Sequence, residues 1–226
     1  MIFTETHTKR LEMPSCFNIN LKSYEALANI QRLVLDSEES KVLLDFTNTN
    51  YIDAIYMAFL GGLRELSKEY NKNLGYCVKQ GTKLYNYFKS SGLYEYIKQG
   101  GSYANKNSIP FSEIHMEEES MVEYINKILD LAPITLSPKA ESHLFTSIYE
   151  IFSNSSDHSE AQSGVFACGH WMPTKKQLVF SVYDTGIGIP TVIKNHINLK
   201  MDSAEALRWA LKTGNSTKQL NDGVPR

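Results

Sequence analysis

The chain has 226 residues and a formal net charge of −2, with 42% hydrophobic and 21% charged residues. This length fits one large domain or two small ones, and the near-neutral charge argues against a nucleic-acid partner. The three cysteines form no CxxC pair, and the sequence shows no signal peptide and no membrane-spanning apolar run, so we expect a cytoplasmic protein in a reducing compartment that does not enter the membrane.

The first hundred residues alternate between helical and strand patterns. Helices are predicted at 20–36, 56–70 and 82–97, with a break near Gly92, and strands at 41–46 and 73–79. This alternation of short units predicts an α/β domain over residues 1–100.

Periodicity then stops. Residues 99–109 are rich in Gly, Ser and Asn, which is typical of a linker. We therefore assign residues 101–133 to a linker with a bridging helix at 118–132. Residues 134–226 form the second predicted domain.

The second domain is predicted to begin with a long helix, because Ser137 is a suitable N-cap and Pro138 suits the first helical position. The helix should end near residue 156. The runs VFACGHWM and QLVFSVYD predict two strands paired as a hairpin, and 203–212 predicts another helix.

Three polar residues share one stripe of the long helix. Glu150, Asn154 and Asp157 are spaced i, i+4 and i+7. The side chains expected to face the core instead are those of Ile148, Ile151 and Phe152. The stripe is either a solvated face near the helix end or a site for a hard cation beside a general base, since Asn and Asp oxygens suit Mg²⁺.

The stretch DTGIGIP follows the second strand of the hairpin directly. Its Asp184 ends the strand, and Gly186 and Gly188 come next with one residue between them. One interpretation is a glycine turn with an Asp cap. The other is a ligand site, in which a carboxylate fixed at a strand end accepts from an exocyclic amine and the glycines let the backbone approach the ligand.

Together, ExxxNxxDH on the helix and DTGIGIP after a strand resemble the GHKL family of ATPases, over roughly residues 130–226. The resemblance implies ATP and Mg²⁺ as ligands. It makes Asn154 the Mg²⁺ ligand, Glu150 the general base and Asp157 a second polar residue near the nucleotide. Asp184 would accept the adenine amino group.

The same resemblance places Gly186 and Gly188 beside the adenine, and Ser216 and Thr217 in the lid over the nucleotide. The chain ends at NDGVPR, where the family's second glycine box would begin. We therefore expect a C-terminally truncated GHKL α/β sandwich, without the last glycine box and strands. A phosphoacceptor helix pair is not found ahead of it, so a self-phosphorylating histidine kinase is not expected.

The first half, at about residues 15–100, resembles the STAS domain of anti-sigma-factor antagonists, in which a strand ending in Asp precedes a loop, an Ile-Asp pair and a helix. Regulated members carry a phosphorylated Ser or Thr after that second Asp. Here Asp53 is followed by Ala54, Ile55 and Tyr56. We expect a STAS-like fold without this phosphoswitch, used to bind a partner or the chain's own ATP domain.

The expected fold class is α/β, as two-layer α+β domains. The expected function is that of an ATP-binding signalling protein that hydrolyses ATP or transfers its phosphate, with a protein partner at the STAS-like domain. Two alternatives stay open: a Ser/Thr protein kinase of the anti-sigma-factor type, and a non-catalytic interaction module with an idle nucleotide site. An unfinished sheet edge would favour pairing into a homodimer.

Overall fold

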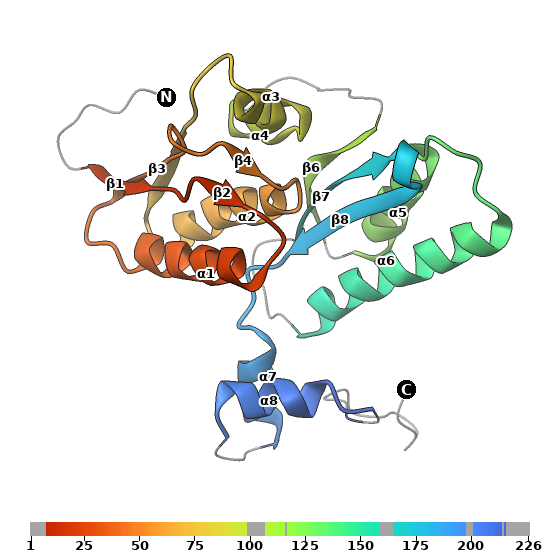
Figure 1. Ribbon diagram of the computed structural model, residues 1–226. Coiled ribbons are helices and arrows are strands. Elements are labelled where there is room, and N and C mark those ends of the chain that lie inside the picture. The colour runs from red at the N-terminus through yellow and green to blue at the C-terminus, as the bar shows by residue number, and fades with distance from the viewer. Residues whose placement is uncertain are drawn as a thin grey trace.

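The computed structural model describes residues 8–98, 107–115, 117–158, 165–197, 201–213 and 215, with the backbone alone at 156–158 and 197. Helices and strands are mixed throughout, so the predicted α/β class, in its α+β form, is confirmed. The two halves of the chain each contribute a three-stranded sheet (Figure 1).

The sheet of the first half is parallel, with strand order β1-β3-β5, and a short parallel pair of β2 and β4 lies beside it. The elements of this half are β1 (Thr8–Glu12), β2 (Cys16–Phe17), α1 (Leu21–Leu35), β3 (Lys41–Asp45), β4 (Tyr51–Ile52), α2 (Tyr56–Glu69), β5 (Asn73–Cys77), α3 (Lys83–Ser90) and α4 (Leu93–Lys98).

Helical spacing of apolar residues explains α1. Its N-cap Asn20 accepts a hydrogen bond from the Ser23 amide at 3.0 Å, and Leu27, Ile30 and Val34 are buried on one face. The central strand β3 contributes the fully buried Val42 and Leu44 to the same core.

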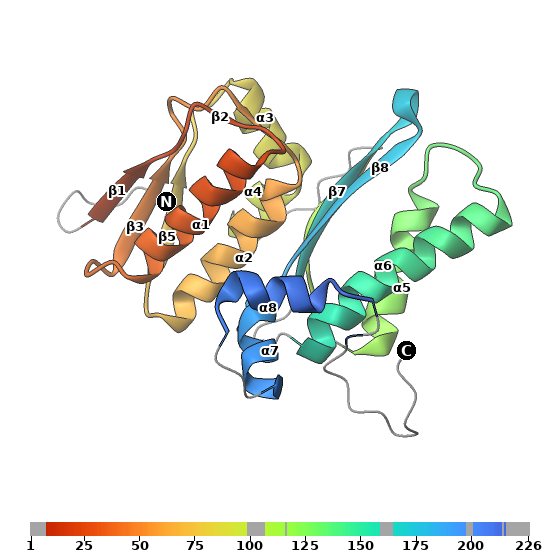
Figure 2. The ribbon, with the colours of Figure 1, turned by 60° about the horizontal axis from the view of Figure 1, so that its bottom comes forward.

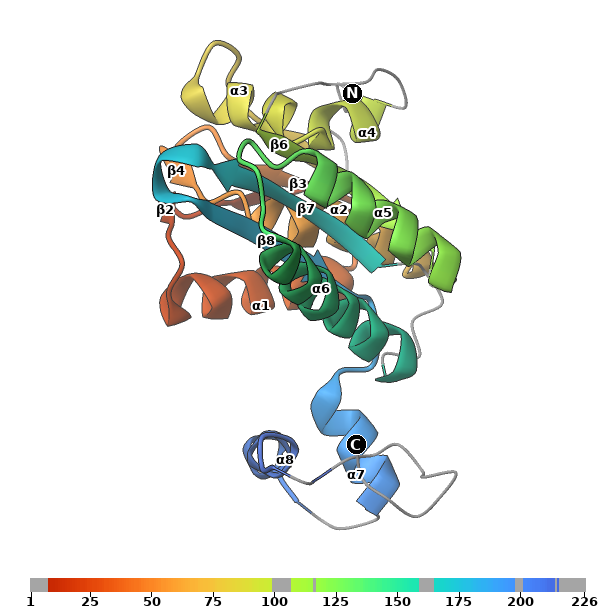
Figure 3. The ribbon, with the colours of Figure 1, turned by 90° about the vertical axis from the view of Figure 1, so that its right-hand side faces the viewer.

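The second sheet is antiparallel, with strand order β6-β7-β8. The elements of this half are β6 (Ser108–Ile114), α5 (Glu118–Asp130), α6 (Pro138–His158), β7 (Val165–Met172), the 3-10 turn η1 (Pro173–Lys175), β8 (Gln177–Tyr183), α7 (Ile189–Ile197) and α8 (Ser203–Ala210). Figure 3 shows α5 and α6 lying over this sheet. Ile125, Phe152 and Trp171 are buried between these helices and the strands.

Helix α2 of the first half packs against the other face of the second sheet. Phe111 of β6 and Phe166 and Cys168 of β7 belong to the same buried cluster as the core of the first half. Two adjacent glycines in α2 permit this approach, because Cβ atoms at Gly61 and Gly62 would overlap aromatic rings of the sheet. The second sheet is therefore covered on both faces.

Most of the predicted helices and strands are present within one or two residues of their predicted ends. Ser137 accepts from the Ala140 amide at 3.3 Å, as expected for the cap of α6, and Gly92 separates α3 from α4 with φ +76°. The sequence did not predict the strands β1, β2, β4 and β6 or the helix α7.

The segment 101–133 was predicted as linker and bridging helix, and its described residues form β6, paired with β7, and α5, packed beside α6. Ile151 was predicted to face the core, and this is wrong, because its side chain is 46% exposed. It lies at the rim of the buried face that Ile148, Phe152 and Ser155 form.

In the part of the chain that the structure describes, no helix combines the length and the apolar character needed to cross a membrane.

Candidate functional site

The C-terminal ends of α6 and β8 lie at the same end of the second sheet (Figures 1 and 2). Helix α6 ends at His158 and β7 starts at Val165. Phe166 near that start pairs with Tyr183, the last residue of β8. The polar end of α6 and the segment after β8 therefore lie at the same end of the second sheet.

Asp184 follows β8 directly and is half-buried. Its Oδ1 accepts a hydrogen bond from the Gly186 amide at 2.9 Å, which fixes the carboxylate at the end of the strand. Its Oδ2 has no hydrogen-bond partner among the described residues. The adjacent Thr185 hydroxyl is buried and has no partner either. Because an unpaired buried polar atom is costly, the Thr185 hydroxyl suits a ligand group. The Asp184 Oδ2 can in addition accept a hydrogen bond from a ligand donor.

The two glycines of the segment differ in conformation. Gly188 has φ +79°, a left-handed conformation that glycine adopts most readily, and its carbonyl accepts from the Thr191 and Val192 amides in the first turn of α7. Gly186 has no positive φ, and its amide holds Asp184. The side chains between and after them, Ile187 and Ile189, are 40% and 54% exposed and offer an apolar surface beside the carboxylate.

Glu150 and Asn154 are both exposed on α6, while Phe152 between them is fully buried. A spacing of i, i+4 brings their side chains together on one helix face. The side-chain oxygen of Asn154 can bind a hard cation such as Mg²⁺. The carboxylate of Glu150 can accept a proton from a nearby water or hydroxyl. Within the described residues, His, Cys, Asp and Glu form no group of three that could hold a metal ion.

The side chains of three predicted site residues lie outside what the structure describes. Ser216 and Thr217 belong to the undescribed C-terminal residues, and for Asp157 the backbone alone is described, as part of α6. Their predicted roles stay predictions.

Tyr183, the residue just before Asp184, was not predicted as part of the site. Its hydroxyl donates to Gln31 Oε1 of α1 at 3.1 Å, and its ring meets Phe59 of α2 edge-on, with 5.3 Å between ring centroids. Burial raises the pKa of Tyr183, so its hydroxyl keeps its proton for this bond. Two helices of the first half thus hold the residue next to Asp184. The one feature of the sequence that could have indicated Tyr183 is that an aromatic residue ends the strand just before Asp184.

In the first half, no exposed hydroxyl follows Asp53 at the position where regulated STAS domains carry their phosphorylated Ser or Thr. Ala54 is buried, and Tyr56 is 2% exposed and donates its hydroxyl to the Asn18 carbonyl at 2.8 Å. Tyr56 therefore supports the fold and is closed to modification.

Comparison of the chain with family models, with curated proteins and with solved structures finds no match in any of the three.

Proposed function

We propose that this chain is an ATP-binding signalling protein with a GHKL-type Mg-ATP site in its second half, coupled to a STAS-like docking or sensor half. The observation that carries the proposal is Asp184, whose carboxylate is fixed at the end of β8 by the Gly186 amide and keeps one oxygen without a partner in the described residues. An adenine amino group is a donor that this oxygen suits.

The polar end of α6 would face the phosphate groups of the same nucleotide. Asn154 would hold Mg²⁺, which, when bound, neutralises charge on the phosphates. Glu150 would take a proton from water in hydrolysis, or from a Ser or Thr hydroxyl in transfer to a protein. Phosphoryl transfer depends mostly on positioning and electrostatics, so few side chains need to take part in the chemistry itself.

Coupling between the halves is supported by Tyr183. A partner that moves α1 or α2 would act on Gln31 or Phe59 and thereby on the residue that precedes Asp184. The first half would in this way transmit a docking event to the nucleotide site.

A Ser/Thr protein kinase acting on another protein is the second candidate. It is favoured by the STAS-like half, whose own switch position holds the buried Ala54, so that a phosphoryl group would have to go to a separate partner. Transfer of labelled phosphate from ATP to a second protein, and not to water, would support this candidate over the ATPase.

Binding of Mg-ATP should raise the thermal stability of the chain. A ligand at one hundred times its Kd stabilises the folded state by about 2.7 kcal/mol. We expect Asn154→Ala to remove the part of this gain that depends on Mg²⁺, measured as the difference between Mg²⁺ and EDTA in thermal unfolding.

Asn86→Ala is the matched control, because Asn86 is likewise an exposed asparagine within a helix, α3. The control should keep the full gain. Equal gains in both variants would contradict the role of Asn154, and no gain in the wild-type chain would favour an interaction module with an idle site.

A further inference from the structure

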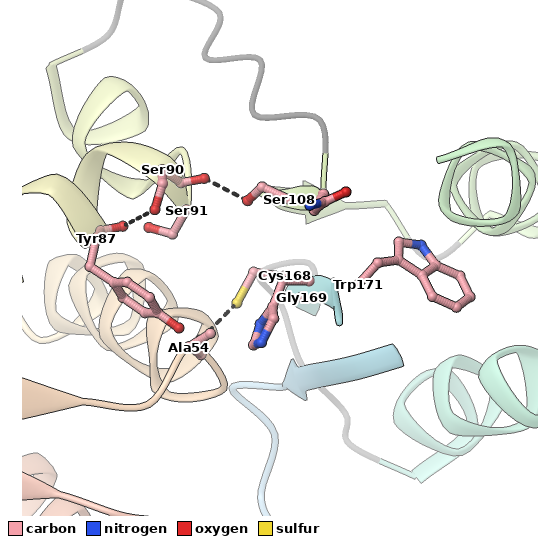
Figure 4. A pocket seen from close by; sticks show the side chains of 10 residues that line it. Ala54, Tyr87, Ser90, Ser91, Ser108, Cys168, Gly169 and Trp171 are labelled. Atoms are coloured by element: carbon pink, nitrogen blue, oxygen red, sulfur yellow. Dashed lines mark hydrogen bonds between the residues drawn. The ribbon is translucent and has the colours of Figure 1, made fainter. Parts of the chain in front are cut away.

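A cavity of about 220 Å³ lies where α2, α3, β6 and β7 meet (Figure 4). Both halves of the chain contribute to its wall. The lining residues come from the segment just before α2 and from the C-terminal end of α3 on one side, and from the beginning of β6 and the second half of β7 on the other.

Three serine hydroxyls of the wall donate hydrogen bonds to backbone carbonyls. Ser90 donates to the Tyr87 carbonyl at 3.1 Å, Ser91 to the Phe88 carbonyl at 3.0 Å and Ser108 to the Ser90 carbonyl. The Ser90 and Ser108 bonds can be followed in Figure 4. With the protons committed to the backbone, the hydroxyl oxygens offer lone pairs to the cavity. The serine side of the wall therefore accepts hydrogen bonds.

His170 adds an unpaired polar atom. Its Nδ1 is buried and has no hydrogen-bond partner among the described residues. Burial lowers the pKa of His170, against a smaller opposing effect of the Asp53 charge, so its ring is neutral at pH 7 and each ring nitrogen is either a donor or an acceptor. A buried nitrogen without a partner suits a ligand group at this point.

Asp53 is the carboxylate that acts on the titratable groups of the cavity wall. Asp53 precedes Ala54, which lines the cavity, and the described lining residues include neither Lys nor Arg. Burial first, and then the Asp53 charge, raise the pKa of Tyr87 and Cys168, the latter to about 12. The Cys168 thiol thus stays protonated, donates to the Ala54 carbonyl at 3.5 Å and is not a nucleophile.

We propose that this cavity binds a small molecule that carries an amino or ammonium group, of about the size of a substituted benzene ring. The Ser90 and Ser108 oxygens accept from the amine, the carboxylate of Asp53 attracts its charge, and Ala54 and Gly169 pack against the carbon frame. Because the wall comes from both halves, such a ligand would stabilise their packing. The inference does not depend on the proposed nucleotide site.

The test uses benzylamine as the cationic probe and benzoate as the anion of matched size, titrated into the full chain and followed by NMR signals of the His170 ring and the Trp171 indole. Benzylamine should shift these signals in a saturable way, and benzoate should bind at least tenfold more weakly. Asp53→Asn, which keeps the side-chain shape, should weaken benzylamine about tenfold.

Ser108→Val should abolish benzylamine binding by filling the cavity and removing an acceptor. Ser112→Val is its control, because Ser112 lies on the same strand, β6, and does not line the cavity. Each variant loses one hydrogen bond from a serine hydroxyl to a backbone carbonyl, so a cooperative thermal transition in both is the check that they are folded. Equal binding of benzoate, equal binding by Ser108→Val and Ser112→Val, or no binding of benzylamine to the wild-type chain would each overturn the proposal.

Discussion

Gly62→Ala should destabilise the chain by about 1–3 kcal/mol, the usual range for overpacking a core. In an ordinary helix the same change would be stabilising by roughly 0.5–1 kcal/mol, because alanine is the better helix former. Here a Cβ at residue 62 would lie 2.2 Å from Cδ1 of Tyr183 and 2.8 Å from Cδ2 of Phe166. The expected sign of the effect is therefore reversed.

The rings that oppose this Cβ have little freedom to move. Phe166 is fully buried and stacks on Phe111, with ring planes 9° apart, and Tyr183 is held by Phe59 and Gln31. Chemical denaturation of the variant measures the loss. A midpoint higher than that of the wild-type chain would contradict the packing of α2 on the second sheet.

A second variant separates this contact from other effects. In a Tyr183→Ala background the ring that the new Cβ would meet first is gone, so Gly62→Ala should cost much less than it does in the wild-type chain. The interaction energy from the four chains of this double-mutant cycle should exceed 0.5 kcal/mol, as is usual for residues in contact. Additive effects would show that the two residues do not meet.

Glu150→Ala should lower the rate of phosphate release or transfer by about 10²–10⁴-fold, the usual contribution of a positioned general base. Binding of Mg-ATP should persist, because the proposed ligand contacts are those of Asn154 and Asp184. Phosphate release with unlabelled ATP and transfer of labelled phosphate to protein are the two readouts.

Glu141→Ala is a suitable control for this prediction. Glu141 is exposed on the same helix, nine residues before Glu150, and should leave the rate unchanged. A rate unaffected by Glu150→Ala, or a wild-type chain that binds Mg-ATP without any turnover, would contradict the role of Glu150 as a base.

The sequence predicted those elements whose apolar pattern is local and complete. Helix α1 and the hairpin of β7 and β8 are examples, since each carries its own periodicity and turn or cap residues. Strand β6 was missed because Pro110 lies within it and its pairing with β7 shifts register between Ile109 and Ser112. Strand β1 is short and lies at an edge, with few apolar residues to mark it.

Some residues of the candidate site can likewise be recognised in the sequence, and others cannot. Asn154 and Asp184 are recognisable because each lies in a short motif at the end of a regular element. Packing between the two halves creates the contacts of α1 and α2 with Tyr183, and it also creates the cavity around His170. No periodicity within either half carries that information, so packing between distant segments had to be seen in three dimensions.

Acceptance of the adenine amino group by Asp184 is tested most directly by a nucleotide titration. GTP carries a carbonyl oxygen where ATP carries that amino group, so a carboxylate acceptor should prefer ATP. We predict that the wild-type chain binds Mg-ATP at least tenfold more tightly than Mg-GTP, by calorimetry or thermal shift. Asp184→Asn should lose most of the ATP affinity and this preference. Equal affinities for the two nucleotides, or an unchanged preference in Asp184→Asn, would contradict the claim.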